Sequence, residues 1–287
     1  MQILRPGYNY KMGANTYIME ENALIPMEDE YVEKMFLGQI ENPIAASGLS
    51  LTQAERIIDQ MVEYKKMRMM YTCALKEIRT KFDVLNTEFG VRYQRNPIEF
   101  ITMRVKSTHS IFEKMRRQNQ MFTMTSLEEN ISDIAGIRVI CSYVDDIYML
   151  AQALLAQDDI TLLREKDYIS HPKDNGYRSL HLIVSVPVFF TDRKKDMKVE
   201  VQIRTIAMDF WASLEHGIKY KKNVPNQQEI VERLKNCAEV IAETDMTMLD
   251  IRREMEDDDI REKREQSGRS SMETLLEKLK RLDTPIV

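Results

Sequence analysis

The spacing of apolar residues divides the chain into helical and strand segments. From 52 to 89 and again from 227 to 255, apolar residues recur every three to four positions, which predicts two long amphipathic helices. Thr52 and Glu55 form a capping-box pattern at the start of the first helix. The stretch "QRNPIEF" ends that helix, and a shorter helix is expected at about 105–121.

A strand-like period appears between residues 136 and 205. The expected strands are rich in Val and Ile, and they are "GIRVICSY" (136–143), "YRSLHLIVSVPV" (177–188) and "MKVEVQIRT" (197–205). Residues 144–157 have helical spacing, and helical spacing returns after the last strand in "IAMDFWASLEHGIKYKK". Because strands and helices alternate, we expect an α/β (α+β) fold in which sheet and helix are interleaved.

The two ends of the chain differ from this middle part. Residues 1–50 lack sustained periodicity and are expected to form a poorly structured extension. Residues 51–222 are expected to form one domain with its leading helix, and 223–287 a C-terminal helical region. Within that region the polar stretch "EDDDIREKREQSGRSS" suggests a flexible hinge before a short helix at 272–282.

Composition narrows the classes of protein. The chain has 287 residues, of which 43% are hydrophobic and 30% charged, an ordinary globular balance. The nearly apolar run "LIVSVPVFF" is too short to span a bilayer, and the N-terminus lacks a secretory signal, so we expect a cytoplasmic protein without a membrane partner. A formal net charge of −5 gives no general attraction to DNA. The 3 cysteines and 4 histidines show no zinc-site spacing.

The strand "VEVQIRT" (199–205) carries candidate chemistry. Its polar residues alternate with aliphatic ones, so Glu200, Gln202 and Arg204 share one face. Asp133 lies in a turn before the strand at 136–143. If this carboxylate meets Glu200 across the sheet, the two would suit Mg²⁺ carrying nucleotide phosphates.

A basic helix face is the second candidate. If 105–117 is helical, Lys106, Ser110 and Lys114 are spaced i, i+4 and i+8, and Arg117 follows three residues later on the same face. Such a face suits a triphosphate, although a solvated basic face of an ordinary helix has the same pattern. Arg104, just before this helix, is placed to stack on a base.

An aromatic residue at a loop–strand junction is the third candidate. The loop "PKDNG" delivers Tyr177 to the start of a strand, with Lys173 and His181 nearby. A tyrosine in this position is a platform for a nucleotide base, or else a residue packed over the sheet edge. His181 by itself fits a structural histidine as well as a binding one.

Together these residues resemble the synthetase domain of the RelA/SpoT family, in particular its RelQ-type small alarmone synthetases. The resemblance runs from about 96 to 222 through "NPIEFITMRVKSTHSIFEKMRR", "ISDIAGIRVIC", "KDYISHPKDNGYRSLHL" and "VEVQIRTIAMDFWASLEHGIKYK". It implies a nucleotidyltransferase-like mixed β-sheet flanked by helices, with extra N- and C-terminal helices. It also implies transfer of the β,γ-pyrophosphate of ATP to the 3′-hydroxyl of GTP or GDP, with AMP released and Mg²⁺ as cofactor.

The resemblance also assigns roles. It implies that Asp133 and Glu200 hold Mg²⁺ and that Glu200, together with Asp133, helps to activate the 3′-hydroxyl as a base. The residues implied to bind ATP, with the first and last on adenine, are Arg104, Lys106, Ser110, Lys114, Arg117 and Arg138. The residues implied to bind GTP or GDP, with the tyrosine on guanine, are Lys166, Lys173, Tyr177, His181, Gln202, Arg204 and Asp209.

The chain departs from the family pattern at two points, and the resemblance also implies an oligomeric state. Many RelQ-type members carry asparagine where this chain has Asp209, which leaves the preference among acceptors open. No His-Asp hydrolase motif precedes Arg104, and 65 residues follow Lys222 (223–287), so we expect synthesis without hydrolysis. RelQ-type proteins are homotetramers, and the helices at 52–89 and 227–255 have apolar stripes that suit such contacts.

Two alternatives remain at this point. Toxic family members transfer pyrophosphate to adenosine nucleotides or to the 3′ end of tRNA, and stacking on Tyr177 accepts any base. A tRNA reader is expected to have a basic patch outside the site, which the acidic balance disfavours. A catalytically dead nucleotide-binding regulator would most simply lack a metal carboxylate, but Asp133 and Glu200 are both present.

Overall fold

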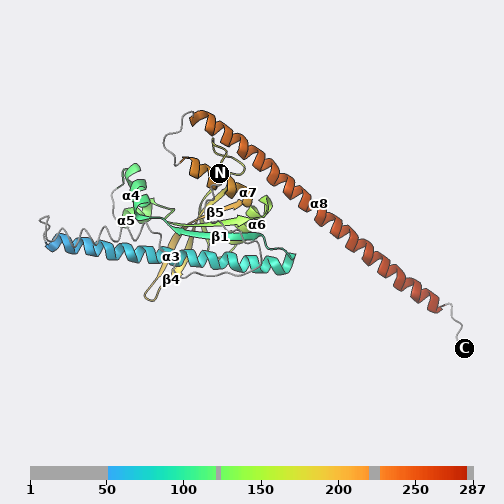
Figure 1. The fold of residues 1–287 in the computed structure, drawn as a ribbon. Helices are drawn as coiled ribbons and strands as arrows, with labels where there is room; N and C mark the ends of the chain where they lie inside the picture. The colour runs from blue at the N-terminus through green and yellow to red at the C-terminus, as the bar shows by residue number, and fades with distance from the viewer. Residues whose placement is uncertain (1–50, 121–123, 220–226, 283–287) are drawn as a thin grey trace, which may run out of the picture. The chain divides into compact units, whose positions relative to one another are not determined.

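The computed structural model describes residues 51–120, 124–219 and 227–282 (Figure 1). The chain divides into two units between Ile58 and Asp59, and the fold below is that of the second, although its first helix begins at Leu51. The extension expected at 1–50 lies outside the described residues. Within the described residues, no helix has the length and apolar character needed to cross a membrane.

A five-stranded mixed sheet lies at the centre of this unit. The strands in spatial order are β1 (Ile98–Val105), β2 (Ala135–Cys141), β5 (Lys194–Thr205), β4 (Leu180–Phe189) and β3 (Thr161–Asp167). Only the central pair, β2 and β5, is parallel among these neighbours, and the remaining pairs are antiparallel. The mixed sheet and the three expected strands are therefore confirmed.

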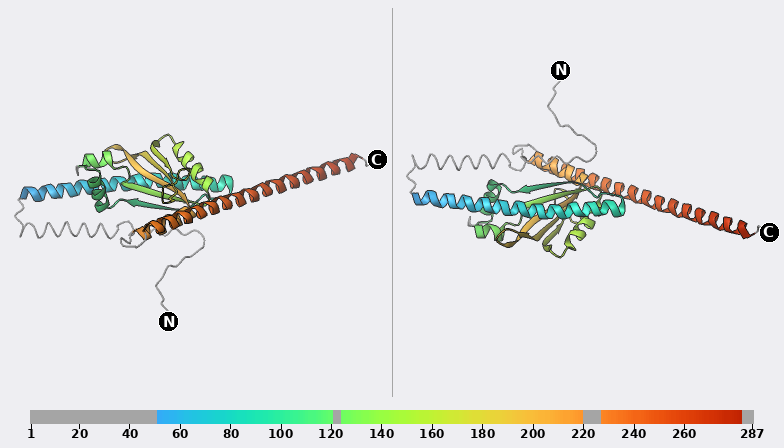
Figure 2. Two further views of the ribbon diagram at one scale, coloured as in Figure 1. Left: turned by 90° about the horizontal axis from the view of Figure 1, so that it is seen from above. Right: turned by 90° about the horizontal axis from the view of Figure 1, so that it is seen from below.

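Helices connect the strands and flank the sheet. In chain order they are α3 (Leu51–Tyr93), α4 (Thr108–Arg117), α5 (Met124–Asn130), α6 (Val144–Leu155), α7 (Ile206–Lys219) and α8 (Gln227–Leu282). Figures 1 and 2 show α3 running along the sheet. The helices expected at 52–89 and 144–157, and the one after the last strand, are confirmed as α3, α6 and α7.

One face of the sheet is apolar and forms the core. Alternation along β5 and β4 turns Val201, Ile203, Leu180 and Leu182 to this face, and all four are buried. α3 contributes buried residues every three to four positions, namely Met67, Tyr71, Ala74, Ile78 and Phe82. Burying an aliphatic or aromatic side chain of this kind stabilises the fold by about 1.5–3 kcal/mol.

The first correction concerns the start of the basic helix. The stretch read as a break before a helix at 105–121 is strand β1 followed by the shorter helix α4. Ser107 is the N-cap, because its side chain accepts a hydrogen bond from the backbone N–H of Ser110. Lys106 therefore precedes the helix, and the predicted helical face of four residues was wrong in that respect.

Two further elements were not predicted. β3 and α5 were not assigned to any element from the sequence, and every residue of β3 from 161 to 166 is exposed. An edge strand with two wet faces lacks the apolar alternation by which strands are recognised. The polar sequence "TLLREKD" therefore gave no strand signal.

The expected hinge at 256–271 is wrong. α8 continues through it without a break to Leu282, so the short helix at 272–282 is the last part of α8. The stretch is rich in Glu, Arg, Lys and Gln, which are strong helix formers, and it contains no proline. The polarity of this stretch therefore does not mark the end of the helix.

Candidate active site

The face of the sheet opposite the core carries a row of polar side chains across four strands. In the register, Arg138 of β2 pairs with Gln202 of β5, and Gln202 pairs with His181 of β4. Lys166 of β3 pairs with His181 and completes the row. Residues far apart in sequence thus lie side by side because β5 inserts between β2 and β4.

A second row lies next to the first. Arg104 of β1 pairs with Gly136 of β2, and Gly136 pairs with Glu200 of β5. Gly136 places no side chain between the arginine and the glutamate. Asp133 stands three residues before Gly136, at the entrance to β2, so the two predicted metal carboxylates approach the same end of the sheet.

Asp133 is held by the two lysines of the predicted phosphate-binding set. Lys106 Nζ lies 2.7 Å from its Oδ2, and Lys114 Nζ lies 2.8 Å from its Oδ1. Burial opposes ionisation, but the contacts with Lys106 and Lys114 outweigh it and hold the pKa of Asp133 below its ordinary value. The carboxylate is therefore ionised at neutral pH.

Glu200 belongs to a closed ring of hydrogen-bonded side chains. Gln202 Nε2 donates to Glu200 Oε2 at 3.0 Å, and His181 Nδ1 lies 3.4 Å from Glu200 Oε1. Tyr177 Oη bonds His181 Nε2 at 2.8 Å. Arg204 Nη2 closes the ring by donating to Tyr177 Oη at 2.9 Å and to Gln202 Oε1 at 2.8 Å.

The ring also governs the charge of Glu200. Burial raises the pKa of this carboxyl, and the charge of Asp133 acts in the same direction. The contacts with His181 and Gln202 outweigh both, so the pKa lies below its ordinary value. Two ionised carboxylates, Asp133 and Glu200, therefore lie at this end of the sheet and repel each other.

Asp209 lies in the first turn of α7 and faces two arginines. Its Oδ1 accepts hydrogen bonds from Arg138 Nη1 and Arg204 Nη1, both at 3.2 Å. The turn is fixed by Thr205, whose Oγ1 accepts from the backbone N–H of Met208 at 3.1 Å. Asp209 thus links the arginine of β2 to the arginine at the end of β5.

The ring of Tyr177 is approached by two cations. Lys173 Nζ lies 4.6 Å from its centroid and 4.5 Å from that of Tyr168, and the Arg204 guanidinium carbon lies 5.4 Å from the Tyr177 centroid. Burial raises the pKa of Tyr177, so its hydroxyl stays protonated and able to donate.

Comparison with known proteins identifies the family. Residues 103–225 match the model described as a region found in RelA / SpoT proteins. The chain is 43% identical over 208 residues to GTP pyrophosphokinase YwaC of Bacillus subtilis (strain 168), covering 72% of this chain and 99% of that protein. The chain belongs to the RelA/SpoT family.

Solved structures of family members have the same fold. The small alarmone synthetase 2 from Bacillus subtilis superposes with a TM-score of 0.60 at 44% identity, over 67% of this chain and 99% of that one. The small alarmone synthetase 1 from the same organism, bound to its product pppGpp, gives 0.61 at 37% identity, over 67% and 97%. The predicted resemblance and fold class are thereby confirmed.

Not every predicted residue of the RelA/SpoT site joins this network. Ser110 Oγ bonds Ser107 Oγ at 2.9 Å, and the exposed Arg117 donates from Nε to the carbonyl of Glu113 at 3.2 Å. Tyr168 was missed, although it packs edge-on against His181 at 5.2 Å between ring centroids. The sequence feature that could have indicated Tyr168 is its position, as a second aromatic residue in the segment that contains Tyr177.

The donor set fits a magnesium ion. Asp133 and Glu200 offer hard carboxylate oxygens, which Mg²⁺ combines with water and substrate phosphates. The negative charge of Asp133 repels that of Glu200 and acts to raise the pKa of Glu200. A bound divalent cation would relieve this repulsion. The two residues are therefore chemically suited to the metal predicted from the sequence.

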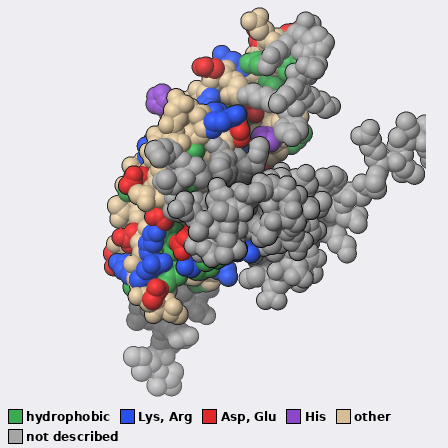
Figure 3. Space-filling model, turned by 90° about the vertical axis from the view of Figure 1, so that its left-hand side faces the viewer, with side chains coloured by type: hydrophobic (Ala, Val, Ile, Leu, Met, Phe, Trp, Pro, Cys, Tyr) green, Lys and Arg blue, Asp and Glu red, His purple; other side chains and the backbone are tan. Residues whose placement is uncertain are grey.

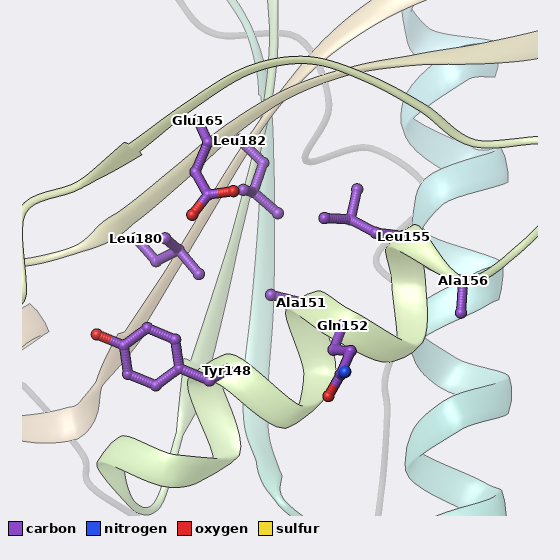
Figure 4. A pocket seen from close by; sticks show the side chains of 8 residues that line it. All are labelled: Tyr148, Ala151, Gln152, Leu155, Ala156, Glu165, Leu180 and Leu182. Carbon is purple, nitrogen blue, oxygen red and sulfur yellow. The ribbon is translucent and has the colours of Figure 1, made fainter.

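A cavity of about 410 Å³ lies elsewhere and does not belong to this site (Figure 4). It is lined by residues of α6, β3 and β4, including Tyr148, Glu165, Leu180 and Leu182. Because the two leucines alternate with His181 along β4, the cavity opens on the apolar face of the sheet.

Proposed function

We propose that this chain is a GTP pyrophosphokinase that transfers the β,γ-pyrophosphate of ATP to the 3′-hydroxyl of GTP or GDP. The observation that carries the proposal is Glu200, held by donors on both carboxylate oxygens beside the ionised Asp133. Membership of a family whose relative YwaC is named GTP pyrophosphokinase supports it.

The strand register supports an adenine site between two arginines. Arg104 pairs with Gly136 and Arg138 pairs with Thr102, so the two arginines are diagonal neighbours on adjacent antiparallel strands. Such neighbours lie about 7–8 Å apart. A planar base in contact with a guanidinium on each side, at about 3.5–4 Å from each, needs that separation.

The reaction then needs positioning and charge neutralisation more than covalent help. The 3′-oxygen of the acceptor bonds to the β-phosphorus, the bond from that phosphorus to the α,β-bridging oxygen breaks, and AMP leaves. Glu200 accepts the proton of the 3′-hydroxyl. Lys106 and Lys114 are placed to bind the donor phosphates once these replace Asp133 as their partners.

Mg²⁺ completes this proposal. Asp133 and Glu200 would hold it, and when bound it would neutralise charge on the phosphates. On the acceptor side, we assign Tyr177 to stacking on guanine, and His181 and Gln202 to orienting the nucleotide over Glu200. Lys173 would then pass from the Tyr177 ring to the acceptor phosphates.

Assembly and location stay proposals as well. We propose a homotetramer that uses α3 and α8. The exposed apolar residues of α8 that suit such a contact are Val240, Met246, Met248, Ile251 and Met255. A measured mass of one chain in solution would contradict this assembly. The cytoplasmic location expected from the sequence stays a prediction.

The test incubates the protein with γ-labelled ATP, Mg²⁺ and, in separate reactions, GTP, GDP, GMP, deacylated tRNA or no acceptor. We expect label on guanosine nucleotides and an equal amount of AMP. Label on tRNA or on an adenosine nucleotide would instead place the chain with the toxic branch of the family. On the face drawn in Figure 3, basic and acidic side chains are interspersed, which does not favour a tRNA surface there.

A further inference from the structure

We propose that Arg204 and Asp209 form a positioning pair that sets the direction of the hydrogen bonds around Glu200, and that Arg204 does not bind the acceptor. This inference deepens the proposed function and rests on it for its kinetic consequence. It replaces the role given to Arg204 by the sequence resemblance, which placed it among residues that contact GTP or GDP.

Burial separates Arg204 from the other cations of the polar face. Its side chain is 3% exposed, whereas that of Arg138 is 40% exposed. A charged group that is this buried is costly unless it is paired. Arg204 finds three acceptors inside the protein, namely Asp209 Oδ1, Tyr177 Oη and Gln202 Oε1.

A guanidinium can only donate hydrogen bonds, and this fixes one branch of the ring. Because Arg204 donates to Gln202 Oε1, the amide must turn its NH₂ group the other way. That group faces Glu200 Oε2 at 3.0 Å. The reversed amide would present its oxygen to the carboxylate, where two acceptors would repel each other.

The other branch starts from the same guanidinium. Arg204 donates to the Tyr177 oxygen, so the phenol proton is available for His181 Nε2 at 2.8 Å. We assign His181 Nε2 as the acceptor of this proton, which in the neutral imidazole leaves the ring proton on Nδ1. Nδ1 lies 3.4 Å from Glu200 Oε1.

Both branches therefore start at one nitrogen, Arg204 Nη2, and end on the two oxygens of Glu200. The guanidinium does not contact Glu200 itself, but it selects the orientation of the Gln202 amide and, through Tyr177, the tautomer of His181. Asp209 favours the charged form of Arg204, because burial lowers the pKa of this guanidinium and the carboxylate of Asp209 acts to raise it. Asp209 also ties Arg204 to Arg138 on the donor side.

The first experiment reads the tautomer directly. The full chain is labelled with ¹⁵N-histidine, and the His181 signals are assigned by their loss in His181→Gln; the sequence has only 4 histidines. We expect Nδ1–H in the unmodified protein and a shift toward Nε2–H in Arg204→Met. Lys166→Met is the matched control, because it removes a cation from the same row but outside the ring, and it should leave the tautomer unchanged.

The second experiment compares acceptors. If Arg204 only positions other groups, Arg204→Met should lower kcat by about the same 10–100-fold for GTP, GDP and GMP, with the KM for ATP unchanged. Arg204→Lys should recover little, because an ammonium lacks the planar fork that reaches three acceptors. Asp209→Asn keeps an oxygen acceptor and should lose less than Arg204→Met.

The outcomes are distinguishable. A loss that grows with the number of acceptor phosphates would show that Arg204 binds the acceptor and would overturn the inference. An unchanged Nδ1–H tautomer in Arg204→Met would overturn it as well. If the unmodified protein transfers no pyrophosphate, the proposed function fails, while the tautomer measurement still decides whether Arg204 directs the ring.

Discussion

Gly176 lies directly before Tyr177 and cannot carry a side chain without cost. Its φ is +88°, and a Cβ built there would lie 2.6 Å from Ala238 Cβ and 3.3 Å from Lys235 Cα, both in α8. The positive φ should cost an alanine about 1–2 kcal/mol. The overlap should add about 1–3 kcal/mol, because the Cβ of an alanine on a helix cannot swing away. We therefore expect Gly176→Ala to lower the free energy of unfolding by about 2–5 kcal/mol.

A double-mutant cycle separates the two contributions. Ala238→Gly removes the atom at 2.6 Å and by itself costs about 1 kcal/mol as a helix substitution. In that background Gly176→Ala should lose the backbone part and keep only the milder contact with Lys235 Cα at 3.3 Å, so the two changes should couple by about 1–3 kcal/mol. Urea unfolding of the four proteins measures this. Equal losses in both backgrounds would refute the packing of α8 against the Tyr177 loop.

Gly217 supplies the matched control for the same assay. It lies in α7, and among the described residues no heavy atom beyond its own helical turns lies within 4 Å of a Cβ built there. Gly217→Ala should therefore be neutral or stabilise the protein by up to about 1 kcal/mol. A loss as large as that of Gly176→Ala would mean that any added methyl group is harmful, whatever its surroundings.

Three further predictions concern charged groups. Glu200→Gln should abolish turnover and keep nucleotide binding, and full activity would contradict the role of Glu200. Arg95→Met leaves Asp146, which is 1% exposed, without the guanidinium that binds it at 2.6 and 2.7 Å, and should cost about 3–5 kcal/mol in urea unfolding. Burial raises the pKa of Asp245 in the folded protein. The free energy of unfolding therefore falls as the pH rises above the pKa that this carboxyl has in the unfolded chain. Asp245→Asn should therefore raise the urea midpoint at pH 7 and less so in acid, and an equal gain at both pH values would argue against this explanation.

The sequence predicted the polar face well because alternation leaves little choice. In "VEVQIRT" the aliphatic residues must enter the core, so Glu200, Gln202 and Arg204 must share the other face. The same alternation turns Arg138 away from the buried Ile137 and Val139 in β2. One strand with two unlike faces was enough to predict the carboxylate, the amide and the guanidinium together.

The ring could not be predicted from the sequence. It requires Tyr177 and Arg204 to meet, which depends on β4 pairing with β5 and on the turn at Gly176. Alternation gives the face of each strand but not the order of strands in the sheet. The contact of Asp209 with both arginines depends likewise on how α7 leaves β5.

The site arranges its cations and anions in pairs before any substrate binds. Lys106 and Lys114 contact Asp133, and Arg138 contacts Asp209, so each of these cations already has a carboxylate partner. If a nucleotide triphosphate and Mg²⁺ enter together as proposed, the phosphates can take the lysines while the metal takes the carboxylate. Binding then exchanges partners and leaves no buried charge unpaired. An unpaired charge would be costly in a low-dielectric site. A chain with a formal charge of −5 can in this way bind a polyanion at a local cluster of cations, although its net charge does not attract one.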